Sequence, residues 1–146
     1  MNIQDWLDQW KLKLPAMSVE TCFIQIADGP EIGLEKIQGG WLMAIRIGRI
    51  SNKISLGVHM QLLQANSPFS PLAPIKLTAD GTGEIVLVVE VQEGKVDILT
   101  INSWYGKLCQ GSYYFRNLLE TTAGGATANA DRPALYVDRK HKLSYV

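Results

Sequence analysis

The feature that most constrains the fold is an alternation of apolar and polar residues with a period of two between residues 20 and 48. Successive side chains of a β-strand point to opposite faces, so this period predicts strands and not helices. Turn sequences interrupt the alternation at Asp28-Gly29-Pro30 and at Gly39-Gly40. The apolar positions are Cys22, Ile24, Ile26, Ile32, Leu34, Trp41, Met43, Ile45 and Ile47. Three strands joined by short turns predict an antiparallel meander.

A second pair of strands is predicted on either side of the turn sequence at residues 80–83. Ile75, Leu77 and Ala79 alternate before this turn, and residues 85–91 are apolar at nearly every position after it. A strand that is apolar on both faces is expected at the centre of a sheet or covered on both sides. The glycines at 80–83 join two strands, whereas nucleotide-binding glycine loops join a strand to a helix, so we interpret this segment as a turn.

Three other segments have the helical period of three and four residues. The first is an expected helix of about three turns that Pro15 ends, with its apolar side formed by Ile3, Trp6, Leu7, Trp10 and Leu14. The second spans about residues 52–66 and precedes a proline-rich loop in which Phe69 and Leu72 are the expected apolar anchors. The third is a long helix that Asp97 caps. Gly106 and Gly111 interrupt it and predict close packing on another element.

This order of elements predicts a single α+β domain over residues 1–120, with an antiparallel sheet of about five strands and three helices in the order α-β-β-β-α-β-β-α. Residues 121–146 begin with small residues and continue into a basic stretch, so a flexible linker and a basic C-terminal tail are predicted there. Within the tail, Leu135, Tyr136 and Val137 are the residues able to dock as a short strand.

The inventory of reactive side chains argues against catalysis and against a metal or cofactor site. Only two histidines, His59 and His141, occur in the chain, so neither a multi-histidine metal site nor a catalytic triad is expected. Cys22 and Cys109 have no CxxC partner. Lys and Arg number 14 and Asp and Glu number 14, a balance that does not favour nucleic-acid binding. We therefore expect a non-enzymatic protein without catalytic, cofactor or metal residues.

The apolar runs are far shorter than the ~18 residues that a membrane-spanning helix needs, and the N-terminal residues do not have the pattern of a signal peptide. We therefore expect a cytoplasmic protein with no membrane partner.

The second predicted helix and the strands after it carry a family resemblance. Its end, QLLQAN at residues 61–66, resembles the LLxAN helix end of the class I chaperones of bacterial type III secretion, the CesT-like family. A proline-containing loop, a short strand at 75–78, an Asp80-Gly81 turn and an apolar strand at 84–91 follow, as in that family. The resemblance covers about residues 2–120 and rests on packing and turn residues.

The resemblance implies a homodimer that binds the N-terminal segment of a secreted effector and keeps it competent for secretion, with the secretion apparatus as a further partner. It places the dimer contact on the second helix. The apolar residues of this helix, Ile54, Val58, Leu62 and Leu63, present more apolar surface than its own sheet can cover.

For the effector-binding site we expect the face shared by the first helix and the meander: Trp6, Trp10, Ile24, Ile26 and Leu34. The alternative for the two tryptophans is that both are ordinary core residues. Two other functions remain open for this fold, a regulatory or protein-interaction module of CesT or YbjN type unrelated to secretion, and a small-molecule-binding domain.

Overall fold

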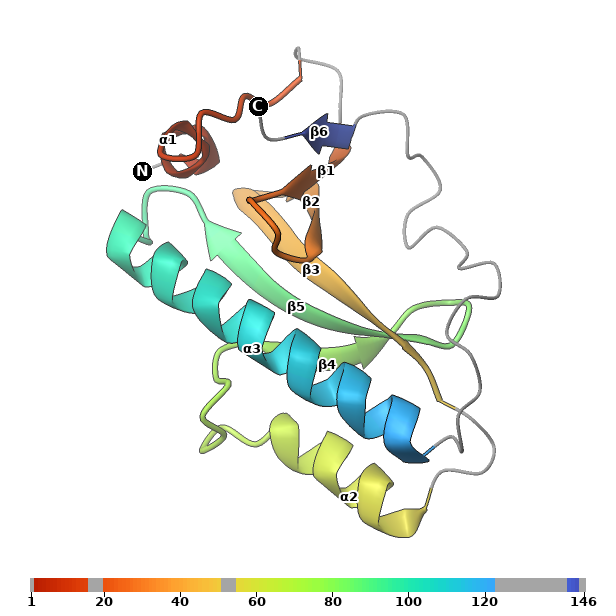
Figure 1. Cartoon of the computed structure of the whole chain (residues 1–146). Helices are drawn as coiled ribbons and strands as arrows, with labels where there is room; N and C mark the ends of the chain where they lie inside the picture. Colours follow the sequence, from red (N-terminus) through yellow and green to blue (C-terminus); the bar gives the residue numbers. More distant parts are fainter. Residues whose placement is uncertain (1, 16–19, 51–54, 123–141, 145–146) are drawn as a thin grey trace.

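The computed structural model describes residues 2–15, 20–50, 55–122 and 142–144. Its strands form one sheet in the order β4-β5-β3-β2-β1-β6. Figure 1 shows α3 running across this sheet, with α1 beside the first turns of α3 and α2 beside its last turns. The elements are α1 (Ile3–Asp8), β1 (Thr21–Gln25), β2 (Glu31–Ile37), β3 (Gly40–Arg49), α2 (Leu56–Ala65), β4 (Lys76–Ala79), β5 (Glu84–Gln92), α3 (Ile98–Thr122) and β6 (Lys142–Ser144). The α+β class and the three-helix order are confirmed.

Helix α1 is shorter than the sequence predicts. It begins with a capping box between Asn2 and Asp5 and ends at Asp8, not at Pro15. Lys11 adopts the left-handed conformation with φ 56°, and the amide of Leu12 donates to the carbonyl of Leu7 at 3.1 Å. This bond pattern is that of a Schellman helix end, which turns the chain so that Leu12 is buried. The expectation of three turns was wrong because the apolar spacing continues through the turn.

The predicted meander forms as expected from its turn sequences. β1 pairs antiparallel with β2, and β2 pairs antiparallel with β3. β3 continues past the meander and pairs with β5, with a register shift between Arg46 and Gly48. Gly48 has φ 146°, a conformation that side chains disfavour, so glycine at this position permits the bulge.

β5 lies inside the sheet, between β4 and β3, as its continuous apolar run predicts. The turn before it is held by Asp80, whose carboxylate accepts hydrogen bonds from the amides of Thr82 at 2.8 Å and Glu84 at 3.0 Å. Burial raises the pKa of Asp80, but hydrogen bonds from the Thr82 hydroxyl and from these two amides outweigh it and lower the pKa below its ordinary value. The interpretation of this glycine-containing segment as a turn between two strands is confirmed.

Helix α3 begins where the sequence predicts, because the carboxylate of Asp97 accepts a hydrogen bond from the amide of Thr100 at 2.7 Å. Gly111 marks close packing, since an added Cβ would lie 3.0 Å from Leu87 Cδ1 and 3.3 Å from Leu72 Cδ2. The same expectation for Gly106 was wrong, because no atom of another element in the described part of the chain lies within 4 Å of its Cβ position.

A sixth strand extends the sheet beyond the expected five. β6 pairs parallel with β1 over Phe23 to Gln25, so one pair of strands departs from the antiparallel pattern. The docking residues suggested by the sequence, Leu135, Tyr136 and Val137, lie outside the described residues, as does most of the predicted linker and tail.

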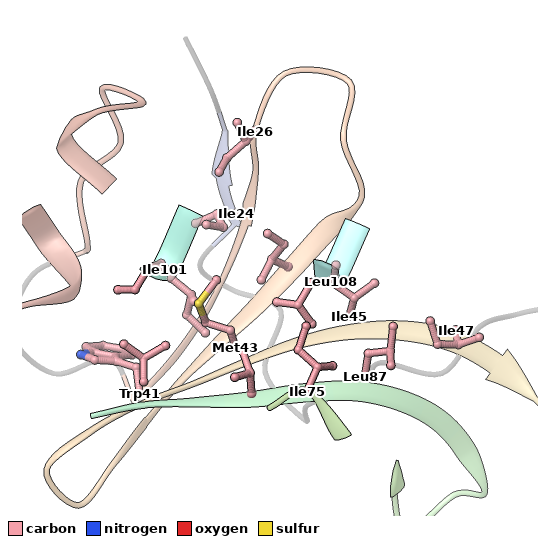
Figure 2. Packing of buried hydrophobic residues seen from close by; sticks show 14 of the residues in the cluster. Ile24, Ile26, Trp41, Met43, Ile45, Ile47, Ile75, Leu87, Ile101 and Leu108 are labelled. Atoms are coloured by element: carbon pink, nitrogen blue, oxygen red, sulfur yellow. The ribbon is translucent and has the colours of Figure 1, made fainter. Parts of the chain in front are cut away.

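The core fills the space between the sheet and the helices. Figure 2 shows Trp41, Met43, Ile45 and Ile47 in a row along β3, with α3 contributing Ile101 and Leu108 to the same cluster. All six side chains are at most 6% exposed. The alternating positions of the meander therefore face the helices, as their period of two predicts.

Candidate protein-interaction surfaces

The expected effector-binding residues cluster around α1, and four of the five are core residues. Trp6, Ile24 and Leu34 are 0% exposed and Ile26 is 3% exposed. Trp6 Nε1 donates to Asn102 Oδ1 at 2.9 Å, which ties α1 to α3. In this structure these four side chains offer no free surface, so their burial favours the core alternative that the sequence left open.

Trp10 differs from the other four because it is only partly buried. Its ring lies 6.1 Å from the ring of Tyr105, and the ring of Trp6 lies 5.8 Å from the same tyrosine. Both tryptophans therefore pack near the same α3 residue. Trp10 Nε1 is buried and has no hydrogen-bond partner among the described residues. Of the five candidates, Trp10 is the one with free aromatic surface beside α1.

The expected dimer residues on α2 separate onto two faces of the helix. Val58 is 4% exposed and belongs to the core, and Leu62 is half-buried against that core. Leu63 is 69% exposed on the outer face. Ile54 lies outside the described residues. Val58 and Leu62 therefore contribute mainly to the fold of the protomer, and among the three described members of the set Leu63 faces outward.

The outer face of α2 carries two further apolar residues that the sequence reasoning missed. Leu56 is 78% exposed and Met60 is 49% exposed. With Leu63 they occupy positions i, i+4 and i+7, which lie on one side of a helix, and we call these three residues the α2 stripe. One sequence signal was available: no charged residue occurs between Lys53 and Lys76. A charge-free surface helix is unusual, since the outer faces of such helices are normally charged or polar.

A cavity of ≈ 470 Å³ adjoins the α2 stripe, between α2, the loop after it and α3. Its apolar lining includes Ala65, Leu72 and Phe115, and Gln61 and Tyr114 stand among its polar members. Tyr114 Oη donates to Gln61 Oε1 at 3.1 Å, so one hydrogen bond joins the two helices here. We call this cavity the α2/α3 pocket.

Phe69, in the loop beside the α2/α3 pocket, is 93% exposed. The sequence predicts Phe69 and Leu72 as apolar anchors of this loop. Leu72 packs against the core, but Phe69 does not. The expectation for Phe69 was wrong because the loop turns its side chain into solvent.

The described residues show no arrangement suited to metal or thiol chemistry. Among them, no group of three or more His, Cys, Asp or Glu side chains could hold a metal ion. Burial raises the pKa of Cys22 to about 11 and also raises the pKa of Cys109, although a hydrogen bond from Tyr105 acts in the opposite direction on Cys109. Both thiols are therefore protonated at neutral pH. Within the described segments, no helix has the length and apolar character needed to cross a membrane.

Neither a protein-family model nor a curated protein sequence matches the chain. Solved structures do match. The chain is 43% identical to SpcU in the heterodimeric ExoU-SpcU complex from the type III secretion system of Pseudomonas aeruginosa, with a TM-score of 0.79, covering 82% of this chain and 99% of that one.

Two more distant structures share the fold. The Yersinia pestis type III secretion chaperone SycH, in complex with a fragment of YscM2, is 14% identical with a TM-score of 0.58, covering 77% of this chain and 98% of that one. A chain of the HopA1-SchA chaperone-effector complex is 17% identical with a TM-score of 0.60, covering 78% of this chain and 89% of that one. Because the identity to SpcU extends over nearly the whole of that protein, this chain belongs to the family of type III secretion chaperones.

Proposed function

We propose that this protein is a non-enzymatic, homodimeric chaperone of the class I, CesT-like type, which binds the N-terminal segment of a secreted effector in the cytoplasm and keeps it competent for secretion. The observation that carries the proposal is the 43% identity to SpcU over 99% of that chain, because SpcU is bound to ExoU. The absence of a metal-binding group among the described residues is compatible with a binding role.

The effector-binding region in this proposal is the neighbourhood of α1, with Trp10 as the contact residue. Trp10 combines a large apolar ring with partial exposure, and such aromatic side chains concentrate binding energy at interfaces. Trp6, Ile24, Ile26 and Leu34 support this surface from inside the core. An unfolded effector segment loses chain entropy on binding, so it requires apolar contacts of this kind.

The homodimer contact in this proposal is the α2 stripe. Leu56, Met60 and Leu63 are large apolar residues exposed on one side of a helix, and the core of a typical protein interface is depleted of charged residues. In a two-fold dimer the same patch meets itself, so a charge close to the axis would face its own copy. The charge-free sequence between Lys53 and Lys76 avoids this repulsion.

Two experiments test effector binding. The first is purification of the protein from its native host, in which we expect a secreted protein to copurify. The second mixes the purified protein with ExoU, the partner of SpcU, and measures complex formation by size-exclusion chromatography. Trp10→Ala should weaken a complex by about tenfold or more, whereas Tyr113→Ala, which truncates an exposed aromatic residue of α3, should not. If no secreted protein copurifies and no complex with ExoU forms, the proposal is wrong.

Light scattering at micromolar concentration tests the dimer. The unmutated protein should have twice the 16.2 kDa mass of one chain, and Leu63→Asp should give a folded protein of 16.2 kDa because the charge is placed twice in a symmetric contact. Val58→Asp is expected to unfold or aggregate instead, since that side chain lies in the core. A monomeric unmutated protein would exclude the proposed dimer.

A further inference from the structure

The loop after α2 holds Phe69 away from its own protomer. The side chain amide of Asn66 forms two hydrogen bonds with the backbone of Leu77, at 2.8 and 2.6 Å. At the other end of the loop, Lys107 Nζ donates to the carbonyl of Ala73 at 2.7 Å. Phe69 stands between these fixed ends and is 93% exposed. The two ends fix the backbone of the loop that presents Phe69, so the loop loses less entropy when it binds than a free segment would.

The α2/α3 pocket adjoins this phenylalanine and has an apolar lining. Ser70 and Pro71, the two residues that follow Phe69, are part of its wall. Gly111 also lines it, and any side chain there would press on Leu87 and Leu72. The pocket volume of ≈ 470 Å³ lies within the range of ≈ 300–1,000 Å³ that is typical of ligand pockets. The pocket is therefore large enough to admit an aromatic ring, and its lining is mainly apolar.

We infer that Phe69 of one protomer inserts into the α2/α3 pocket of a second copy of this chain, and that the second copy returns the same contact. The inference rests on the proposed homodimer and names its anchor. Phe69 and the pocket are neighbours in one chain, so a two-fold axis that passes beside this loop brings each Phe69 opposite the other pocket. The loop and α2 carry no charged residue, so two copies approach here without like-charge repulsion.

Dissociation of the full-length dimer, measured by analytical ultracentrifugation over a dilution series, tests the contact. Truncating an anchor residue weakens binding by roughly 30-fold or more, and symmetry applies the change twice. Phe69→Ala should therefore raise the dimer dissociation constant on the order of 1000-fold. The matched control is Leu99→Ala, which removes another exposed apolar side chain at the far end of α3 and should leave the constant unchanged. Equal effects of both variants would overturn the inference.

The second measurement locates the side chain directly. The protein is prepared with p-benzoylphenylalanine at position 69, and isotope-labelled and unlabelled copies are mixed before irradiation. We expect crosslinks between a labelled and an unlabelled copy that map to the pocket, at Ala65, Leu72 or Phe115. Crosslinks within one copy, or to a surface outside the pocket, would show that the inference is wrong.

These experiments separate the inference from the proposed function. If the unmutated protein is a monomer, the proposed dimer and the inference both fail. If Leu63→Asp dissociates the dimer and Phe69→Ala does not, the α2 contact remains and only the exchange of Phe69 is excluded. If Phe69→Ala leaves the dimer intact but weakens the complex with ExoU, Phe69 contacts the effector and not a second copy, and the inference is wrong.

Discussion

Replacing Trp6 with alanine tests whether this buried side chain holds α1 against the core. The Trp6 side chain is 0% exposed, and a buried aromatic residue removes about 150–250 Å² from water. At about 25 cal/mol per Å² this burial corresponds to roughly 4–6 kcal/mol, an upper estimate because the unfolded chain also buries some apolar area. Measured tryptophan truncations in cores cost about 3–5 kcal/mol. We therefore expect Trp6→Ala to lower the free energy of unfolding by about 3–5 kcal/mol.

Urea unfolding followed by circular dichroism at several protein concentrations measures this loss, since a dimer unfolds in a concentration-dependent way. Trp6→Phe is the matched control, because it keeps most of the apolar area but removes the indole N–H that bonds to Asn102. It should cost about 1–2 kcal/mol. Trp10→Ala should cost less than Trp6→Ala, because Trp10 is only partly buried.

A Trp6→Ala protein whose free energy of unfolding lies within about 0.5 kcal/mol of the unmutated value would refute this reasoning. Such a result would mean that the α1 contact seen here contributes little, and that Trp6 is free to act as a surface residue. If Trp6→Ala is strongly destabilised while Trp10→Ala is stable and impaired in effector binding, the two tryptophans have separate roles.

Three further predictions concern backbone, charge and the C-terminal residues. Gly40→Ala should lower the free energy of unfolding by more than about 2 kcal/mol, because a Cβ there would overlap the carbonyl oxygen of Val91. Gly81→Ala, whose Cβ meets none of the described neighbours within 4 Å, should have little effect in the same urea titration. Hydrogen bonds from Thr100 lower the pKa of Asp97 below its ordinary value of 3.8. The stabilisation by the ionised carboxylate is therefore fully present above pH 3.8 and is lost as the pH falls through the lowered pKa of the folded protein. The difference in urea midpoint between the unmutated protein and Asp97→Ala should be full at pH 7 and vanish in strong acid. Deletion of residues 123–146 should leave the circular dichroism spectrum nearly unchanged, but the amides of β1 should exchange faster with solvent, because β6 pairs with that strand. Loss of the folded spectrum would contradict the prediction that the tail is separate from the folded domain.

Local chemistry explains why much of the fold was predictable from the sequence. The period of two places Met43 and Ile45 on one face wherever the strand lies, and the Asp80 turn closes with hydrogen bonds inside a few residues. Asp97 caps α3 through an amide three positions away. Each of these features depends on neighbours in the chain, so no knowledge of distant contacts was needed.

The position of α1 and the exposed surface of the protein could not be predicted from the sequence, because both depend on contacts between residues that are far apart in the chain. The spacing of Trp6 and Trp10 indicates a shared helical face, but it does not say whether α3 covers that face. In the structure both rings pack near Tyr105 of α3 and Asn102 bonds to Trp6, so most of the expected effector site lies in the core. The helix also ended early, because a left-handed turn at Lys11 buries Leu12.

Helix α2 shows most clearly what the sequence by itself determined and what only the tertiary structure decided. The sequence determined that a helix ends in QLLQAN before a proline loop, and that the helix is apolar on more than one side. It did not determine which side meets β4, because Val58 and Leu63 are equally apolar. Packing against the sheet and α3 buried Val58 and left Leu63 exposed, since a helix beside a core can bury only one of its faces.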